Sequence, residues 1–129
     1  MRVLVDADVF IAVLQAEPEK GEIARELLNS THYISTSTAV LMEIRTVLAK
    51  KKAQPMQKVA SALDTIRQRL DYYITSVPSF SLIDNLQKET LLYPMDCIHY
   101  STAMENELIL ASFDSELQGN GAISPSDLI

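Results

Sequence analysis

The order of apolar and polar residues along the chain alternates between two kinds of segment. Short apolar runs are typical of strands buried on both faces of a parallel sheet, and they cover residues 2–5, 33–35, 72–75 and 108–111. Between them, apolar residues recur every three or four positions, as in amphipathic helices. These helical segments cover residues 22–29, 38–50, 56–70, 80–92 and 95–107. A weaker apolar pair at residues 122–123 predicts one last short strand.

Strands that alternate with helices predict an α/β protein, a three-layer α/β/α sandwich with a mostly parallel central sheet. Parallel strands need long right-handed crossovers, which the helical segments supply. The Ser/Thr cluster 35–38 can cap the helix that follows it, and residues 50–53 separate two helices. Pro55 and Pro94 suit first helical turns. The chain has 129 residues and no visible repeat or linker, so we expect one domain over residues 1–129.

Composition excludes several classes of protein. The hydrophobic share of 47% and charged share of 22% are ordinary for a globular protein. No apolar run approaches the roughly 18 residues that cross a bilayer, and Asp6 and Asp8 would charge the apolar stretch of a signal peptide. A single cysteine, Cys97, excludes an internal disulfide and a cysteine-rich zinc site, and we expect it to be a buried apolar residue. We therefore expect a protein of the reducing cytoplasm with no membrane partner.

The net charge of −6 argues against tight binding of a polyanion through bulk charge alone. The charge is nevertheless segregated along the chain. Residues 45–70 hold seven bases and one acid, whereas the rest holds four bases and sixteen acids. This basic segment is either a solvated helix surface or a place where the phosphates of a nucleic acid bind.

Acidic residues occupy the positions where a parallel sheet forms its sites, beyond the carboxyl ends of strands. Asp6 follows the first strand, with Asp8 two residues later, and Asp114 follows the fourth strand. Glu43 lies in the helix after the second strand, and Asp96 lies in the first turn of the last helix. Each acid alone has an ordinary explanation as a helix cap or a solvated side chain. Together, four of them can converge on one edge of the sheet: Asp6, Glu43, Asp96 and Asp114.

Electrostatics determines what such convergence requires. Two carboxylates about 5 Å apart repel by roughly 3 kcal/mol at an effective dielectric near 20. A cluster therefore persists only when something neutralises it, and oxygen ligands select hard cations such as Mg²⁺ or Mn²⁺. Such an ion lowers the pKa of a bound water and polarises a phosphoryl oxygen. The pattern indicates hydrolysis of a phosphodiester.

Three segments, in order, resemble those of the PIN domain family, in particular its VapC-type toxins. VLVDADVFIAVL resembles the opening strand and Asp, STSTAVLMEI the segment that bears a Glu, and DCIHYSTAMENELILASFDSEL the closing segment with two further acids. The resemblance implies an acidic metal site formed by Asp6, Glu43, Asp96 and Asp114. It also implies Mg²⁺- or Mn²⁺-dependent cleavage of RNA, a homodimer, and a small antitoxin protein that occupies the active-site groove.

The sequence departs from the family pattern at three positions. The residue after the first Asp is usually Ser or Thr and here is Ala7, the usual Asn beyond it is Asp8, and Ser112 stands where Thr is common. Loss of a hydroxyl at Ala7 weakens support for a metal ligand. These departures bear on rate and metal affinity more than on the fold.

The resulting hypothesis gives each residue a role. Asp6 anchors the metal, Asp96 and Asp114 complete its coordination, and Glu43 orients the attacking water. Four residues are expected to support these ligands: Asp8, Ser37, Thr38 and Ser112. Four bases are expected to contact RNA phosphates: Arg45, Lys50, Lys51 and Lys52. His99 lies three residues after Asp96 and is predicted to be a helix-surface residue, because an activated water needs no histidine as base.

Two alternatives remain open at this point. VLVDADVF also fits the opening of haloacid-dehalogenase-like phosphatases, with Asp6 as nucleophile and Asp8 as general acid. The chain is short for that fold, and its closing segment offers one acid, Asp114, where that family usually has a pair. The second alternative is a degenerate PIN domain that binds RNA or protein without cutting, because Ala7 lacks the usual hydroxyl.

Overall fold

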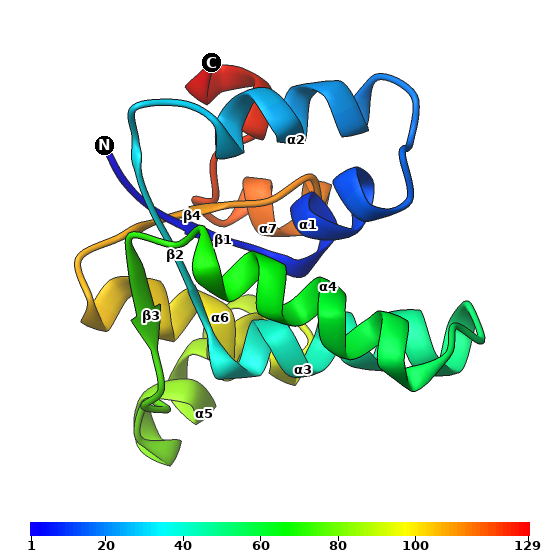
Figure 1. The fold of residues 1–129 in the computed structure, drawn as a ribbon. Helices are drawn as coiled ribbons and strands as arrows, with labels where there is room; N and C mark the ends of the chain where they lie inside the picture. Colours follow the sequence, from blue (N-terminus) through cyan, green and yellow to red (C-terminus); the bar gives the residue numbers. More distant parts are fainter.

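A four-stranded parallel sheet forms the centre of the fold in the computed structural model, which describes residues 1–129 (Figure 1). All neighbouring strands pair in parallel, in the order β3-β2-β1-β4. The strands are β1 (Arg2–Val5), β2 (Tyr33–Ser37), β3 (Tyr72–Ile74) and β4 (Ile109–Ala111). Helices cover both faces, which confirms the predicted three-layer α/β/α sandwich with a parallel sheet.

The five predicted helical segments are all helical, with ends displaced by a few residues. They are α2 (Lys20–Leu28), α3 (Thr38–Thr46), α4 (Met56–Gln68), α5 (Phe80–Thr90) and α6 (Pro94–Glu105). The apolar pattern did not mark three further elements, namely α1 (Ala7–Leu14), α7 (Ser115–Gly119) and the 3₁₀ helix η2 (Pro125–Leu128). Helix α1 is apolar on nearly all sides, so its sequence has no clear stripe to reveal the helical period.

The two faces of the sheet lie against separate cores, because successive side chains of a strand point in opposite directions. Val3 and Val5 of β1 belong to a cluster of 18 buried residues formed with helices α1 to α4. Leu4 belongs to a cluster of nine formed mainly with α6 and α7, against which α5 packs. Figure 1 shows α5 beside α6 and α1 beside α2. Cys97 is buried in the smaller core, as predicted.

The helix that begins at Thr38 does not continue as an α-helix to residue 50. After Thr46 it widens into a π-helical turn, η1 (Val47–Lys51), in which the N–H of Lys52 donates to the carbonyl of Val47 at 3.0 Å. The chain then turns at Ala53, which has a φ of 50°, and Pro55 stands immediately before α4. Such π turns are rare and occur often at functional sites.

The sheet reverses its strand order at β1, which has β2 on one side and β4 on the other. The carboxyl end of β1 leads directly to Asp6, and that of β4 leads directly to Ser112. Both residues therefore lie at the edge where open α/β sheets form sites. The predicted last strand reduces to one parallel bridge between Ile123 and Ala111. None of the helices has the length and apolar character needed to cross a membrane.

Candidate metal centre

Asp6 is the residue at which β1 gives way to α1. Its side chain is 7% exposed and accepts two hydrogen bonds, from the Ala7 N–H to Oδ1 and from the Ser112 hydroxyl to Oδ2, both at 2.8 Å. The first bond caps α1 and the second comes from the loop after β4. Two separate parts of the chain therefore hold this buried carboxylate in place.

Ser112 joins three acids of the site. Its Oγ lies 2.8 Å from Asp6 Oδ2 and 3.1 Å from Asp8 Oδ2, and it accepts from the Asp114 N–H at 3.0 Å. A hydroxyl has one proton, so it donates to one carboxylate at a time. Asp8 Oδ2 also accepts from the Phe113 N–H at 3.1 Å, whereas its Oδ1 is buried without a partner. The predicted supporting residues Asp8 and Ser112 are thus in contact with the site.

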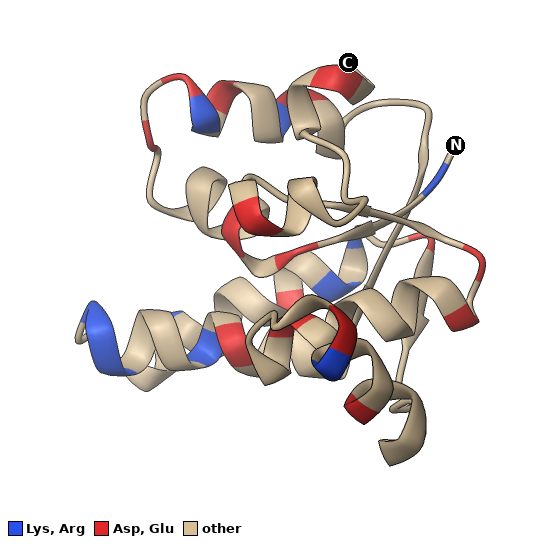
Figure 2. Ribbon diagram, turned by 180° about the vertical axis from the view of Figure 1, so that it is seen from behind, with Lys and Arg blue, Asp and Glu red and all other residues tan.

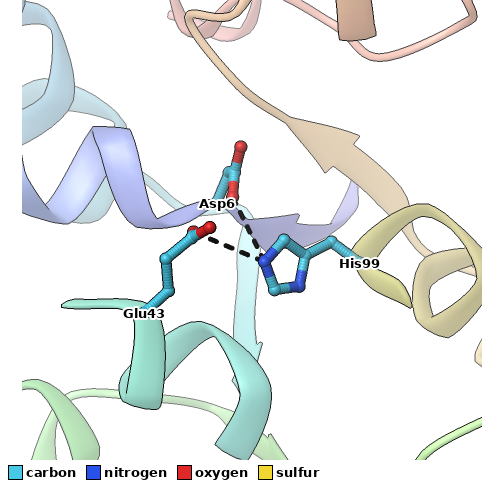
Figure 3. A group of neighbouring side chains, drawn as sticks. All are labelled: Asp6, Glu43 and His99. Atoms are coloured by element: carbon cyan, nitrogen blue, oxygen red, sulfur yellow. Dashed lines mark ion pairs between the residues drawn. The ribbon is translucent and has the colours of Figure 1, made fainter. Parts of the chain in front are cut away.

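Side chains from three elements meet beside Asp6. Figure 3 shows Glu43 of α3, His99 of α6 and Asp6 pointing toward one another. His99 Nε2 lies 3.4 Å from Glu43 Oε2 and 4.0 Å from Asp6 Oδ1. One ligand atom from each of the three residues lies within 4.8 Å of the other two. This spacing matches a set of groups that share one metal ion.

The prediction that His99 is a helix-surface residue is wrong. Its side chain has 0% exposure, and neither ring nitrogen has a hydrogen-bond partner. Helix α6 packs against α3, α5 and β4, so most of its circumference is covered. The small residues Ser101, Thr102 and Ala103 are all buried too. Because these buried residues and His99 do not form one apolar stripe, the sequence of α6 carries no signal that could have located His99.

All four predicted acids line one open cleft of about 550 Å³, together with Asp8. Asp96 is partly buried in the first turn of α6. Asp114 is exposed, and its Oδ1 caps α7 by accepting from the N–H groups of Glu116 and Leu117. Ala7, whose missing hydroxyl the sequence had marked, also lines the cleft, and five further lining residues were not singled out from the sequence: Ile11, Met42, Thr46, Val47 and Met95.

Two predicted supporting residues do not contact the acids. The Ser37 hydroxyl caps α3 by accepting from the Val40 N–H at 3.2 Å. The Thr38 hydroxyl lies 2.7 Å from the hydroxyl of Tyr73 on β3. Both side chains therefore stabilise the start of α3 and its contact with the sheet, and neither has a hydrogen bond to the acids that it was expected to support.

The predicted phosphate-binding bases separate in the structure. Lys51 lines the cleft, whereas Arg45, Lys50 and Lys52 do not. Figure 2 shows basic residues at the end of the arm formed by η1 and the start of α4, and acidic residues grouped near the middle of the molecule. Of the four predicted bases, only Lys51 thus reaches the acidic cleft.

Burial dominates the electrostatics of the acids. It raises the pKa of Asp6 above its ordinary value, although His99 and the hydrogen bond from Ser112 partly offset this. Burial, followed by the charge of Asp6, raises the pKa of Asp8 to about 7. Burial and the neighbouring carboxylates, Asp6 foremost, raise the pKa of Asp96 to about 6. The carboxylates are therefore held in a surrounding that favours added positive charge.

The neighbouring carboxylates raise the pKa of His99 as they raise that of Asp96, whereas burial acts on the two groups in opposite directions. Burial alone lowers the pKa of His99, but Glu43 and then Asp6 raise it, and the net direction is upward. No lysine or arginine forms an ion pair with the cluster, because the two such pairs lie at Asp64–Arg67 and Asp84–Lys88. Carboxylate and imidazole groups are donors for divalent ions. The donor set and the unpartnered buried atoms thus fit a divalent metal.

The fold and the site together define a parallel α/β protein with an acidic centre where the strand order of its sheet reverses, at β1. The family profile described as PIN domain matches residues 3–121, and the chain belongs to this family. No curated protein matches the sequence at a significant level. Membership in the PIN family sets aside the phosphatase alternative.

Solved structures share this fold at low sequence identity. PAE2754 from Pyrobaculum aerophilum superposes with a TM-score of 0.73 at 17% identity, over 99% of this chain and 86% of that one. VapC20 from Mycobacterium tuberculosis, a sarcin-ricin loop cleaving toxin, gives 0.72 at 18% identity, over 94% and 96%. VapBC2 from Rickettsia felis, bound to a DNA fragment from its promoter, gives 0.73 at 20% identity, over 96% and 97%.

Proposed function

We propose that this protein is a metal-dependent ribonuclease and the toxin of a type II toxin–antitoxin pair. The observation that carries the proposal is the meeting of Asp6, Glu43, Asp96 and Asp114, which are far apart in the sequence, around one cleft. Neither of the two ion pairs formed by lysine or arginine involves any of these four carboxylates. The similarity in fold to a toxin that cleaves the sarcin-ricin loop supports RNA as substrate.

The carboxylates divide the work of the centre. Asp6 is fixed by two hydrogen bonds and anchors the ion, while Asp96 and Asp114 complete the coordination, directly or through water. Glu43 holds the attacking water in line with the phosphorus. When bound, Mg²⁺ or Mn²⁺ supplies a Lewis acid and a more acidic water. Ser112 keeps the Asp6 and Asp8 carboxylates in position.

RNA binding relies on the basic arm, because the rest of the surface is acidic. Lys51 contacts a phosphate within the cleft, and Lys50 and Lys52 extend this contact along the strand. Arg45 is partly buried one turn earlier and adds positive charge. Contacts of this kind depend on salt and carry no base specificity.

Protein partners are part of the proposal. The Rickettsia felis VapBC2 and Haemophilus influenzae VapBC-1 structures, which share this fold, support a small antitoxin partner for this chain. We also propose a homodimer. Phe80, Leu91 and Tyr93 expose 79%, 78% and 74% of their area at the two ends of α5. Large apolar side chains exposed to this degree are candidates for contact with a second copy of the chain.

Asp6→Asn tests the enzymatic proposal. Diverse RNAs are incubated with the wild type in Mn²⁺ and in EDTA, and with the variant in Mn²⁺. We expect cleavage only by the wild type in Mn²⁺, with a loss of at least about 10²-fold in the variant, because an amide cannot anchor the ion. Asp64→Asn changes an exposed acid on α4 and serves as the matched control. Equal cleavage by Asp6→Asn and wild type would refute the proposal.

Thermal melting during Mn²⁺ titration separates the enzyme from a degenerate domain. A ligand that binds the native state raises the melting temperature. We expect a rise for wild type and Asp64→Asn, and a much smaller rise for Asp6→Asn. A melting temperature that stays constant up to millimolar Mn²⁺ in the wild type would favour the non-catalytic alternative.

A further inference from the structure

The least satisfied side chain of the centre is the imidazole of His99. It has 0% exposure, and both of its nitrogens are buried without a hydrogen-bond partner. Nε2 faces two carboxylates, those of Glu43 and Asp6 (Figure 3). A buried polar group without a partner lowers stability, so native proteins rarely keep one without a function.

The distances around Nε2 suit a bound ion better than a direct hydrogen bond. Nε2 lies 3.4 Å from Glu43 Oε2 and 4.0 Å from Asp6 Oδ1, both longer than an ordinary hydrogen bond. Two ligand atoms about 2.1 Å from one ion are about 3 Å apart at a right angle and about 4.2 Å apart when opposite. Both observed distances fall between these limits, and the ligand atoms of Asp6 and Glu43 lie within 4.8 Å of each other, so an ion fits among the three groups after side-chain shifts of about half an ångström.

We propose that His99 Nε2 is a direct metal ligand, together with carboxylate oxygens of Asp6 and Glu43, so that the centre is a mixed nitrogen–oxygen site. The inference rests on the metal centre of the proposed function and adds a metal preference to it. Mg²⁺ selects oxygen ligands and near-ideal octahedral geometry. Imidazole suits first-row transition ions, so this centre selects such an ion, with Mn²⁺ as the probe, over Mg²⁺.

Glu43 gains a second role in this arrangement, because it binds the ion as well as lying beside the attacking water. A competing explanation is that His99 only positions Glu43 by donating a hydrogen bond to it. The two explanations differ in one observable: direct ligation puts a nitrogen nucleus on the metal, whereas positioning leaves an all-oxygen shell. The test therefore reads out the ligand atoms, and activity is not needed.

The experiment is pulsed electron paramagnetic resonance of the full chain with one equivalent of Mn²⁺ and no RNA. We expect nitrogen coupling from a coordinated imidazole in the wild type, altered when only the histidines carry ¹⁵N. The chain has two histidines, and His32 precedes β2 at the opposite end of the strands. His32→Gln therefore serves as the matched control and keeps the coupling, whereas His99→Gln loses it.

Competition between the two ions supplies the second readout. We expect the wild type to bind Mn²⁺ at least about 100-fold more tightly than Mg²⁺, and His99→Gln to narrow this ratio by roughly tenfold or more. Glutamine retains an oxygen donor near the position of Nε2, so the variant still binds Mg²⁺. If His99→Gln does not fold, the nitrogen coupling in the wild type alone decides.

The outcomes separate the two proposals. Bound Mn²⁺ without nitrogen coupling, or an unchanged Mn²⁺-to-Mg²⁺ ratio in folded His99→Gln, overturns the histidine ligand and leaves the metal centre standing. Absence of any Mn²⁺ binding by the wild type overturns the metal centre and the histidine ligand together. Nitrogen coupling in the wild type and in His32→Gln supports the mixed site.

Discussion

The acidic cleft and the basic arm carry opposite charge and are built in opposite ways. The cleft gathers acids from four distant segments, of which Asp6 is buried and held by two hydrogen bonds, Glu43 and Asp96 are partly buried, and Asp114 is exposed. The basic charge of the arm comes from one continuous segment, residues 50–52. Its lysines are exposed and form no ion pair. Burial raises the pKa values of acids in the cleft, whereas water screens the charges of the lysines in the arm. Substitutions in the cleft should therefore change chemistry and stability, and substitutions in the arm should change RNA affinity alone.

The largest effect is expected from Glu43→Gln. The change keeps the shape of the side chain but removes the charge that faces His99 and that, in the proposed function, orients the attacking water. Cleavage of RNA should fall by about 10²–10³-fold, while RNA affinity measured by filter binding stays within about twofold. Glu26→Gln alters an exposed glutamate of α2 and should cleave like the wild type. A Glu43→Gln protein with wild-type turnover contradicts the role given to the cleft.

Ser112→Ala should have the next largest effect, because it removes the hydroxyl that joins Asp6, Asp8 and Asp114. Buried Asp6 Oδ2 loses its donor, which should lower the free energy of unfolding by about 1–3 kcal/mol. Activity should fall by roughly 10–100-fold. Urea denaturation and RNA cleavage measure the two effects. Ser61→Ala, at an exposed position of α4, is the control, and matching losses in both variants would show that the hydroxyl has no special place.

The pH dependence of metal-free stability follows from Asp8. Burial and the charge of Asp6 raise its pKa to about 7 in the folded chain, so the folded state keeps a proton that the unfolded state loses near pH 4. Stability in EDTA should therefore be highest at acidic pH and decline as the pH rises toward 7. Asp8→Asn should match the wild type near pH 3, below the pKa of the unfolded side chain, and its excess free energy of unfolding should grow between about pH 4 and pH 7, up to roughly 4 kcal/mol at pH 8.

Asp64→Asn, at an exposed position, provides the baseline for this pH series. Asp96, whose pKa is raised to about 6, is present in every variant. It therefore causes part of the decline in the free energy of unfolding in all of them. The prediction concerns only the gap between Asp8→Asn and wild type. A gap that stays constant from pH 5 to pH 8 would show that Asp8 is charged throughout this range.

The smallest effect is expected from Lys51→Glu in the arm. RNA affinity should fall by several-fold, and the slope of log affinity against log salt should become shallower by about one unit. Folding stability should stay within about 0.5 kcal/mol of the wild type, because the side chain is exposed. Lys58→Glu makes the same charge change on exposed α4, outside the cleft. Identical salt slopes for these two variants would assign the arm to solvent.

Much of the fold follows from local sequence pattern. Short apolar runs and helical spacing located four strands and five helices, because burial on two faces or on one stripe leaves a period in the sequence. The position of Asp6 at a strand end then located the cleft. The sequence could predict that the acids lie together, because parallel strands bring their carboxyl ends to one edge of the sheet.

The contacts that the sequence did not predict depend on tertiary packing. His99 lies on a helix covered on several sides, so no polar stripe distinguishes its buried face from an exposed one. Ser37 and Thr38 stand at a strand end, as metal-supporting hydroxyls would, but nearer partners at Val40 and Tyr73 take their hydrogen bonds. The π turn depends on one additional residue per turn, which leaves no compositional trace.

The central claim is that distant acids at the carboxyl edge of the sheet form one metal centre. Anomalous diffraction from a crystal grown with Mn²⁺ tests it most directly, because the ion's position is observed without reference to activity. The account predicts a strong peak within about 2.5 Å of an Asp6 carboxylate oxygen, on the side that faces Glu43 and His99. A crystal saturated with Mn²⁺ that shows no peak in this cleft would contradict it.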